Sequence, residues 1–233
     1  DLSFFQNFFV KFYQAFIEAD RWLQYLNGVK TTLLVTALAL ILGVALGVTV
    51  AILRTAHDQQ RPGHRNPVLA VLNLVCKIYV TVIRGTPMMV QLLIMGFVIF
   101  ASSRNFTMIG TLTLGINSGA YVSEIVRGGL MSVDKGQMEA GRSLGLGYGT
   151  TMRFVIVPQA VKAILPALGN EFIVLLKDTS LITVIGGKEL LYAAQGIYNR
   201  TYEQMFPLVG TAAIYLVLVI ILSRSEERRV GKD

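Results

Sequence analysis

Apolar residues fill most of this chain, and polar residues divide them into segments. Residues 31–53 and 204–223 contain no charged side chain, and each run has about the length of a helix that crosses a bilayer. Further apolar runs complete a set of five expected spans: residues 29–53, 67–103, 106–126, 163–185 and 205–222. The pattern therefore predicts an all-α membrane protein with five transmembrane helices.

Residues 1–27, which precede the first expected span, are rich in aromatic side chains at spacings of three and four, with polar residues between them. This spacing predicts an amphipathic helix that lies at the membrane surface as an anchor. Asn27 and Gly28 favour a break, after which we expect a membrane domain over residues 28–223 and a charged cytoplasmic tail over residues 224–233.

The second expected span is too long for one upright helix and contains Arg84-Gly85-Thr86-Pro87. Pro87 lacks a backbone donor and Gly85 loosens a helix, so a break belongs there. We expect one long, broken span, and the alternative is two spans with a tight turn at Gly85. In the first span, Gly43 and Gly47 form a pair that lets another helix approach closely.

Composition supports the membrane prediction, since 53% of the residues are hydrophobic and only 15% are charged, against about a quarter in soluble domains. The apolar runs make a nucleic-acid-binding protein untenable despite a net charge of +7. The single cysteine, Cys76, excludes a disulfide within the chain, and two histidines in one loop, His57 and His64, make a metal site improbable.

Positive charges decide the expected orientation, because lysine and arginine collect on the cytoplasmic side. One side carries twelve of them: Arg54, Arg61, Arg65, Arg127, Lys135, Arg142, Arg153, Lys162, Arg224, Arg228, Arg229 and Lys232. The other side carries six: Lys11, Arg21, Lys30, Arg104, Lys188 and Arg200. We expect the N-terminus outside and the C-terminus in the cytoplasm, together with the loop over residues 127–162.

That loop contains a polar, glycine-rich stretch, residues 139–158, between two apolar segments. Its first residues favour a short helix, and Gly145, Gly147 and Gly149 then interrupt it. Residues 148–157 can form a second short helix, which ends where Pro158 opens the next segment. The stretch predicts a helix–turn–helix that another protein can grip, although an ordinary loop with turn-forming glycines is the plainer interpretation.

Enzyme signatures do not stand out. The GLGYGTT sequence superficially resembles a phosphate-binding loop but lacks the lysine that would reach the phosphates, and HExxH is missing. We therefore expect that this chain does not itself hydrolyse ATP and that it contains no catalytic residue, metal or cofactor.

The motifs of the loop resemble the EAA loop of permease subunits of ABC-type importers: Glu139-Ala140-Gly141, Gly145, Val155, Val157 and Pro158. Gly141 stands where that loop usually has alanine. Further motifs narrow the resemblance to polar amino-acid permeases of the histidine/glutamine/arginine type. They are Arg84-Gly85-Thr86-Pro87 with Gln91, the YVSEIVRG sequence from Tyr121 to Gly128, Ser132-Val133, Gly136-Gln137, Asn170-Glu171-Phe172, and the LKDTSL sequence from Leu176 to Leu181.

The resemblance implies a multi-pass subunit of a prokaryotic cell membrane that forms a pathway with a second, identical or similar permease. Separate P-loop ATPase subunits would bind ATP and Mg, and an extracytoplasmic solute-binding protein would deliver the amino acid. The coupling residues that it implies are Glu139, Ala140, Gly141, Ser143, Leu144 and Gly145. Small residues, Ala140, Gly141 and Gly145, would permit close docking to the ATPase.

Polar residues within spans are candidate substrate ligands, because each is costly there. Glu171 would hold the α-amino group or a cationic side chain, with neutral partners among Asn170, Gln91, Ser118, Tyr121 and Ser180. The alternative is that Glu171 and Asn170 only join neighbouring helices. We expect Lys177 and Asp178 to form an internal ion pair, and Arg84 to brace the broken span.

Two other functions remain open from the residues alone. A gradient-driven secondary amino-acid transporter also uses broken helices and intramembrane carboxylates, but it usually has more spans and an internal repeat. A channel would not need an EAA-type loop.

Overall fold

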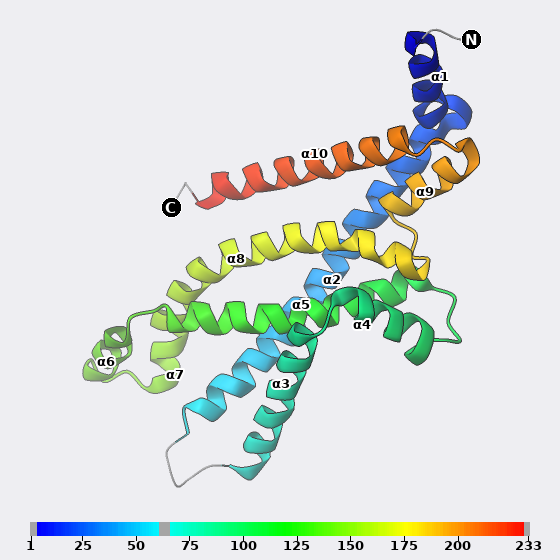
Figure 1. Cartoon of the computed structure of the whole chain (residues 1–233). Helices are drawn as coiled ribbons and strands as arrows, with labels where there is room; N and C mark the ends of the chain where they lie inside the picture. The colour runs from blue at the N-terminus through cyan, green and yellow to red at the C-terminus, as the bar shows by residue number, and fades with distance from the viewer. Residues whose placement is uncertain (1–3, 61–65, 231–233) are drawn as a thin grey trace. The chain divides into compact units, whose positions relative to one another are not determined.

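The computed structural model describes residues 4–60 and 66–230, and all regular elements in this part of the chain are helices (Figure 1). The α-helices are α1 (Phe4–Phe16), α2 (Arg21–Asp58), α3 (Pro67–Gly85), α4 (Met88–Ile94), α5 (Phe106–Met131), α6 (Lys135–Ser143), α7 (Tyr148–Thr151), α8 (Val157–Asp178), α9 (Leu190–Thr201) and α10 (Met205–Val230). Short 3-10 segments occupy Glu18–Asp20 and Thr179–Ile185, and π-helical segments occupy Met95–Ile99 and Met152–Ile156. Arg61, Arg65 and Lys232, three cations of the expected cytoplasmic side, lie outside the described residues.

Four helical stretches are long and apolar enough to cross a membrane: Glu18–Asp58, Pro67–Gly85, Tyr148–Ile185 and Met205–Ser225. A further helix, α5, has 26 residues and is about 39 Å long at the usual helical rise, which also exceeds the hydrocarbon thickness. The expected all-α membrane fold is confirmed.

The break expected at Asn27 and Gly28 is wrong. Helix α2 runs through both residues, and the chain changes direction earlier, at Ala19 and Asp20, whose φ angles are 54° and 53°. Gly28 serves close packing instead, because a Cβ there would lie 2.7 Å from the Cα of Leu190. The boundary that the sequence suggested between residues 27 and 28 therefore falls inside a helix.

The N-terminal amphipathic helix is present as α1, and one of its faces packs on other helices. The ring of Phe8 lies 4.9 Å from that of Phe206, and the ring of Phe16 lies 5.4 Å from that of Tyr25. The ammonium group of Lys11 pairs with Glu203 at 2.7 Å. Other aromatic side chains of α1 remain exposed, as an interfacial anchor requires, and its position at the membrane surface stays a prediction.

The break in the second expected span is confirmed at Thr86 and Pro87. Helix α3 ends at Gly85, and Thr86 is extended, with φ −116° and ψ 144°, as the residue before a proline prefers to be. The apolar helix Met88–Ile99 that follows is about 18 Å long, well short of the roughly 30 Å that a full span requires. Its length favours one broken span over two complete spans.

The helices form two compact units, which we describe separately. Unit 1 contains residues 1–39, 88–114 and 173–233, and unit 2 contains residues 40–87 and 115–172. Three long helices, α2, α5 and α8, contribute residues to both units.

Close helix packing in unit 2 depends on the glycine pair that the sequence singled out. A Cβ at Gly43 would lie 2.8 Å from the Oγ of Ser118, and one at Gly47 would lie 2.6 Å from the Cβ of Val122. The two missing side chains thus let α2 approach α5, and the predicted role of the pair is confirmed. A core around Ala51, Val122 and Val126, joined by partly buried residues of α8, extends this packing.

Candidate functional site

The loop after α5 folds into the predicted helix–turn–helix, made of α6 and α7, at one end of unit 2 (Figure 1). Asp134 caps the start of α6, because its carboxylate accepts a hydrogen bond of 2.6 Å from the backbone N–H of Gly136. This cap defines the first turn of α6 without any contact from another protein.

Gly145 ends α6 in a Schellman motif. Its φ is +80°, and its N–H donates to the carbonyl of Arg142 at 3.0 Å, while the N–H of Leu146 donates to the carbonyl of Gly141 at 3.1 Å. The left-handed conformation favours glycine, because a side chain is strained there. Gly145 therefore sets the direction in which α6 ends.

Gly141 does not lie on the exposed face of α6, as close docking to a partner would require. It is buried, and a Cβ there would lie 2.5 Å from the Cγ2 of Thr151, itself fully buried. The small size of Gly141 thus lets α6 pack on α7, and its predicted part in docking to an ATPase subunit stays a prediction. Thr151 fills the space that an alanine at position 141 would occupy.

The remaining coupling candidates form an exposed surface, namely Glu139, Ala140, Ser143, Leu144 and Gly145. Leu144 exposes 81% of its surface at the tip of this short helix. In the described part of the chain, Glu139 forms no ion pair, so its carboxylate is available to a partner. An apolar tip beside an unpaired carboxylate is a surface suited to protein binding.

The helix–turn–helix is tied to the ends of neighbouring helices. The Tyr148 hydroxyl donates to the Gln59 side chain just beyond α2, and the Gln159 amide donates to Gln137 at 3.3 Å. Asp58, at the end of α2, pairs with Arg127 of α5 at 3.1 Å. Sequence reasoning missed Tyr148 and Gln59, since they are 89 positions apart and no local pattern links them.

Helix α7 continues into α8, so the helix that contains the fourth expected span begins well before residue 163. The chain is helical without interruption from Tyr148 through the π-helical segment Met152–Ile156 to Asp178. Pro158 does not end the second short helix, because it lies in the first turn after the π segment, where a missing N–H is tolerated. One continuous helix, residues 148–178, which we call the rod, therefore joins the helix–turn–helix to the middle of α8.

On that rod, Glu171 meets Ser118 of α5. The Ser118 hydroxyl donates to Oε1 of Glu171 at 2.7 Å, and the two residues are 0% and 8% exposed. The absent side chain of Gly43 leaves room for Ser118 at this point. Two of the predicted substrate ligands are thereby brought together, in a buried and polar environment.

Tyr121 lies one helical turn after Ser118 and is 38% exposed. The guanidinium of Arg84 is stacked 5.2 Å above its ring centroid, within cation–π range. Asn170 is exposed beside Glu171. Unit 2 thus presents a carboxylate, a hydroxyl, an amide and a stacked cation, groups that together match the charges of an amino acid.

The other two candidates, Gln91 and Ser180, belong to unit 1. Gln91 is buried on α4, and the Ser180 hydroxyl donates to the carbonyl of Lys177 at 2.8 Å. The ion pair expected between Lys177 and Asp178 is not formed among the described residues. Adjacent helical residues point in different directions, which explains its absence.

Comparison with known proteins places these features in context. The family described as "Binding-protein-dependent transport system inner membrane component" matches residues 68–227. A putative glutamine transport system permease protein GlnP of Rickettsia typhi is 34% identical over 219 residues, which cover 93% of each chain. The glutamine transport system permease protein GlnP of Escherichia coli K12 is 36% identical over 215 residues, 88% of this chain and 92% of that one.

Solved structures give the same picture. An amino acid ABC transporter crystallised with histidines shares 39% identity and a TM-score of 0.81, covering 90% of this chain and 94% of its own. The inward-facing MetNI methionine ABC transporter shares 21% identity and a TM-score of 0.73, covering 93% and 99%. The second likeness concerns the fold alone.

Proposed function

The chain belongs to the family of binding-protein-dependent transport system inner membrane components, and from this premise we propose that it is the permease subunit of an ATP-driven importer of a polar amino acid. Its relatives named for glutamine and the related amino acid ABC transporter support this class of substrate. The protein forms the translocation pathway with a second permease, identical or similar.

The observation that carries the proposal is the exposed tip of α6 at the end of a continuous helical rod. ATPase subunits, which bind ATP and Mg, grip the surface around Glu139 and Leu144. Their closure on ATP moves α6, and the packing of Gly141 on Thr151 passes this movement to α7 and α8. Because Glu171 lies on the same rod, about 35 Å from Tyr148 along the axis, the movement reaches the candidate substrate site.

In the substrate site, Glu171 holds the α-amino group of the amino acid, or a cationic side chain, by a charge-assisted hydrogen bond. Ser118 orients the carboxylate, as their 2.7 Å hydrogen bond supports. Tyr121 and Asn170 contribute neutral groups, whereas Gln91 and Ser180, which belong to unit 1, stay candidates from the sequence alone.

The subunit lies in a prokaryotic cell membrane with its N-terminus outside and its C-terminus in the cytoplasm. The excess of lysine and arginine on the side of the α6–α7 loop supports this orientation. A solute-binding protein delivers the amino acid from the outside.

Co-purification tests the proposal against the gradient-driven alternative. The tagged subunit, expressed with its neighbouring genes, should retain a P-loop ATPase, and vesicles containing the complex should take up amino acid only with ATP. Uptake by the isolated polypeptide, driven by an ion gradient, would refute the proposal.

A further inference from the structure

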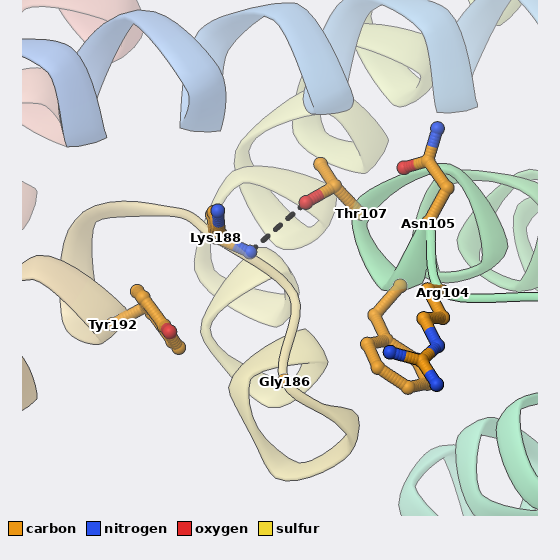
Figure 2. A pocket seen from close by; sticks show the side chains of 7 residues that line it. Arg104, Asn105, Thr107, Gly186, Lys188 and Tyr192 are labelled. Atoms are coloured by element: carbon orange, nitrogen blue, oxygen red, sulfur yellow. Dashed lines mark hydrogen bonds between the residues drawn. The ribbon is translucent and has the colours of Figure 1, made fainter.

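A cavity of about 570 Å³ opens in unit 1 where two connecting segments meet (Figure 2). One segment leads into α5 and the other into α9. The residues that line the cavity are Arg104, Asn105, Phe106, Thr107, Gly186, Lys188 and Tyr192. By the distribution of positive charge along the chain, both segments belong to the extracytoplasmic side.

The two segments are held together by a contact between distant residues. The backbone N–H of Lys188 donates to the Thr107 hydroxyl at 2.9 Å, the bond drawn dashed in Figure 2. Gly186, with φ +90°, turns the chain beside the ring of Phe106. These contacts within the chain therefore fix the two segments that form the wall of the cavity.

The cavity carries a net positive charge. Arg104 and Lys188 are both exposed, and within the described part of the chain neither forms an ion pair. None of the seven lining residues is acidic. The first turn of α5 adds the positive end of a helix dipole to the same place.

Glu189, the acid next to Lys188, does not neutralise this charge. It is 1% exposed and accepts hydrogen bonds from the Tyr215 hydroxyl at 2.5 Å and from the backbone of Tyr192 at 2.9 Å. Burial raises the pKa of Glu189, and its carboxylate is engaged by these buried donors rather than by the cations of the cavity.

We propose that this cavity receives an acidic side chain of the solute-binding protein and so fixes that protein on the permease, an inference that rests on the proposed function. An exposed ion pair alone strengthens the binding of a free amino acid by less than about fivefold. A docked protein excludes water around the pair and adds surrounding contacts, which makes the same charges more effective. Arginine and tyrosine, both present here, are enriched in protein interfaces.

The test uses the complete transporter in nanodiscs and the solute-binding protein that activates the wild-type complex. The variant is Arg104→Glu/Lys188→Glu, and the matched control is Arg200→Glu, which reverses an exposed cation of α9 outside the cavity. ATP hydrolysis is measured as the concentration of binding protein is raised, at low and high salt.

We expect the double variant to raise the half-saturating concentration of binding protein about tenfold at low salt, with an unchanged maximal rate and less dependence on salt. Arg104→Lys should preserve the wild-type value, and the control should remain within about twofold of it. An unchanged half-saturating concentration in the double variant, or an equal rise in the control, would overturn the proposal.

Two further readouts separate the possible failures. Retention of the ATPase subunit by the double variant shows that its complex is assembled, whereas a wild-type chain that never binds an ATPase contradicts the proposed function itself. If the free amino acid activates hydrolysis without binding protein, and charge reversal weakens that activation instead, the cavity serves the substrate and the docking proposal is wrong.

Discussion

Replacing Gly141 by alanine isolates the packing of α6 on α7. Helix propensity alone predicts a gain of about 1 kcal/mol, because glycine is unfavourable inside a helix. In the structure, however, the new Cβ would lie 2.5 Å from Cγ2 and 2.9 Å from Oγ1 of Thr151, which is fully buried and cannot move aside freely. Overpacking of this kind costs about 1–3 kcal/mol, so the net effect is a loss of about 1 kcal/mol.

Because 1.4 kcal/mol corresponds to a factor of ten, this loss should weaken binding of the ATPase subunit by about fivefold and reduce transport per ATP hydrolysed. The assay is titration of purified ATPase against the reconstituted permease, with uptake and hydrolysis measured in the same vesicles. Gly149→Ala is the matched control: Gly149 lies in α7 with nothing within 4 Å of a new Cβ, so this substitution should not weaken binding.

A second substitution tests the cause. Thr151→Ala removes the two nearest of the three atoms that the new methyl group meets and leaves only Cβ at 3.3 Å, so Gly141→Ala/Thr151→Ala should recover most of the lost affinity. The reasoning is refuted if Gly141→Ala binds the ATPase as tightly as the wild type, or if the double variant is weaker than Gly141→Ala alone.

Four further predictions address other parts of the chain. Gly145→Val should lower the stability of the α6–α7 loop by about 1–2 kcal/mol, because valine is strained at this left-handed φ, and should uncouple ATP hydrolysis from uptake in vesicles. Gly147→Val, at an ordinary φ, should have only a small effect on coupling. Equal effects of the two substitutions would contradict the capping role of Gly145. Glu171→Gln should abolish substrate-stimulated uptake without loss of ATPase co-purification, and normal uptake would end its proposed role. Gly43→Leu, which displaces Ser118, should impair uptake and lower the melting temperature together, whereas an unchanged protein would show that the α2–α5 contact is dispensable. The hydrogen bond from Lys11 lowers the pKa of Glu203. The pair therefore stabilises the docking of α1 fully above the ordinary pKa of a glutamate, and this stabilisation is lost as the pH falls through the lowered pKa. Lys11→Gln should remove this pH dependence, which hydrogen exchange in α1 measures.

Local chemistry made several features predictable from sequence. Pro87 forces an extended residue before it, Gly145 supplies the left-handed cap of α6, and Gly43 leaves the space that α5 fills. Each feature depends on a residue whose backbone conformation or small size is compatible with few local structures, so the residue type alone predicts the structure.

The errors have a common physical origin in tertiary packing. Asn27 and Gly28 look like a turn, but Leu190 packs against Gly28 and the helix continues. Pro158 looks like a helix start, but the π segment before it accommodates a ring without an N–H. Sequence predicted Ser118 and Glu171 as separate candidate ligands. It could not predict their hydrogen bond, because no sequence pattern indicates that α5 and α8 pack together at these residues.

The same limit applies to the coupling surface. Motif resemblance grouped Gly141 with the exposed residues around it, although its contact with Thr151 turns it inward. Exposed residues of α6 are available to a partner protein, whereas buried ones pack on α7. Which residues are exposed depends on how α6 packs, and the motif alone does not determine this.

The most direct test of the coupling claim uses a cysteine at Leu144, the exposed tip of α6. The only native cysteine in this chain, Cys76, is buried, so a maleimide that carries a photoreactive benzophenone should react selectively at the new thiol and, on illumination, bond to the protein in contact with it. The account predicts that Leu144→Cys cross-links to the ATPase subunit in membranes, while Tyr202→Cys, 93% exposed beyond α9, does not. A Leu144→Cys permease that is labelled only from outside the cell, and never joined to the ATPase, would contradict it.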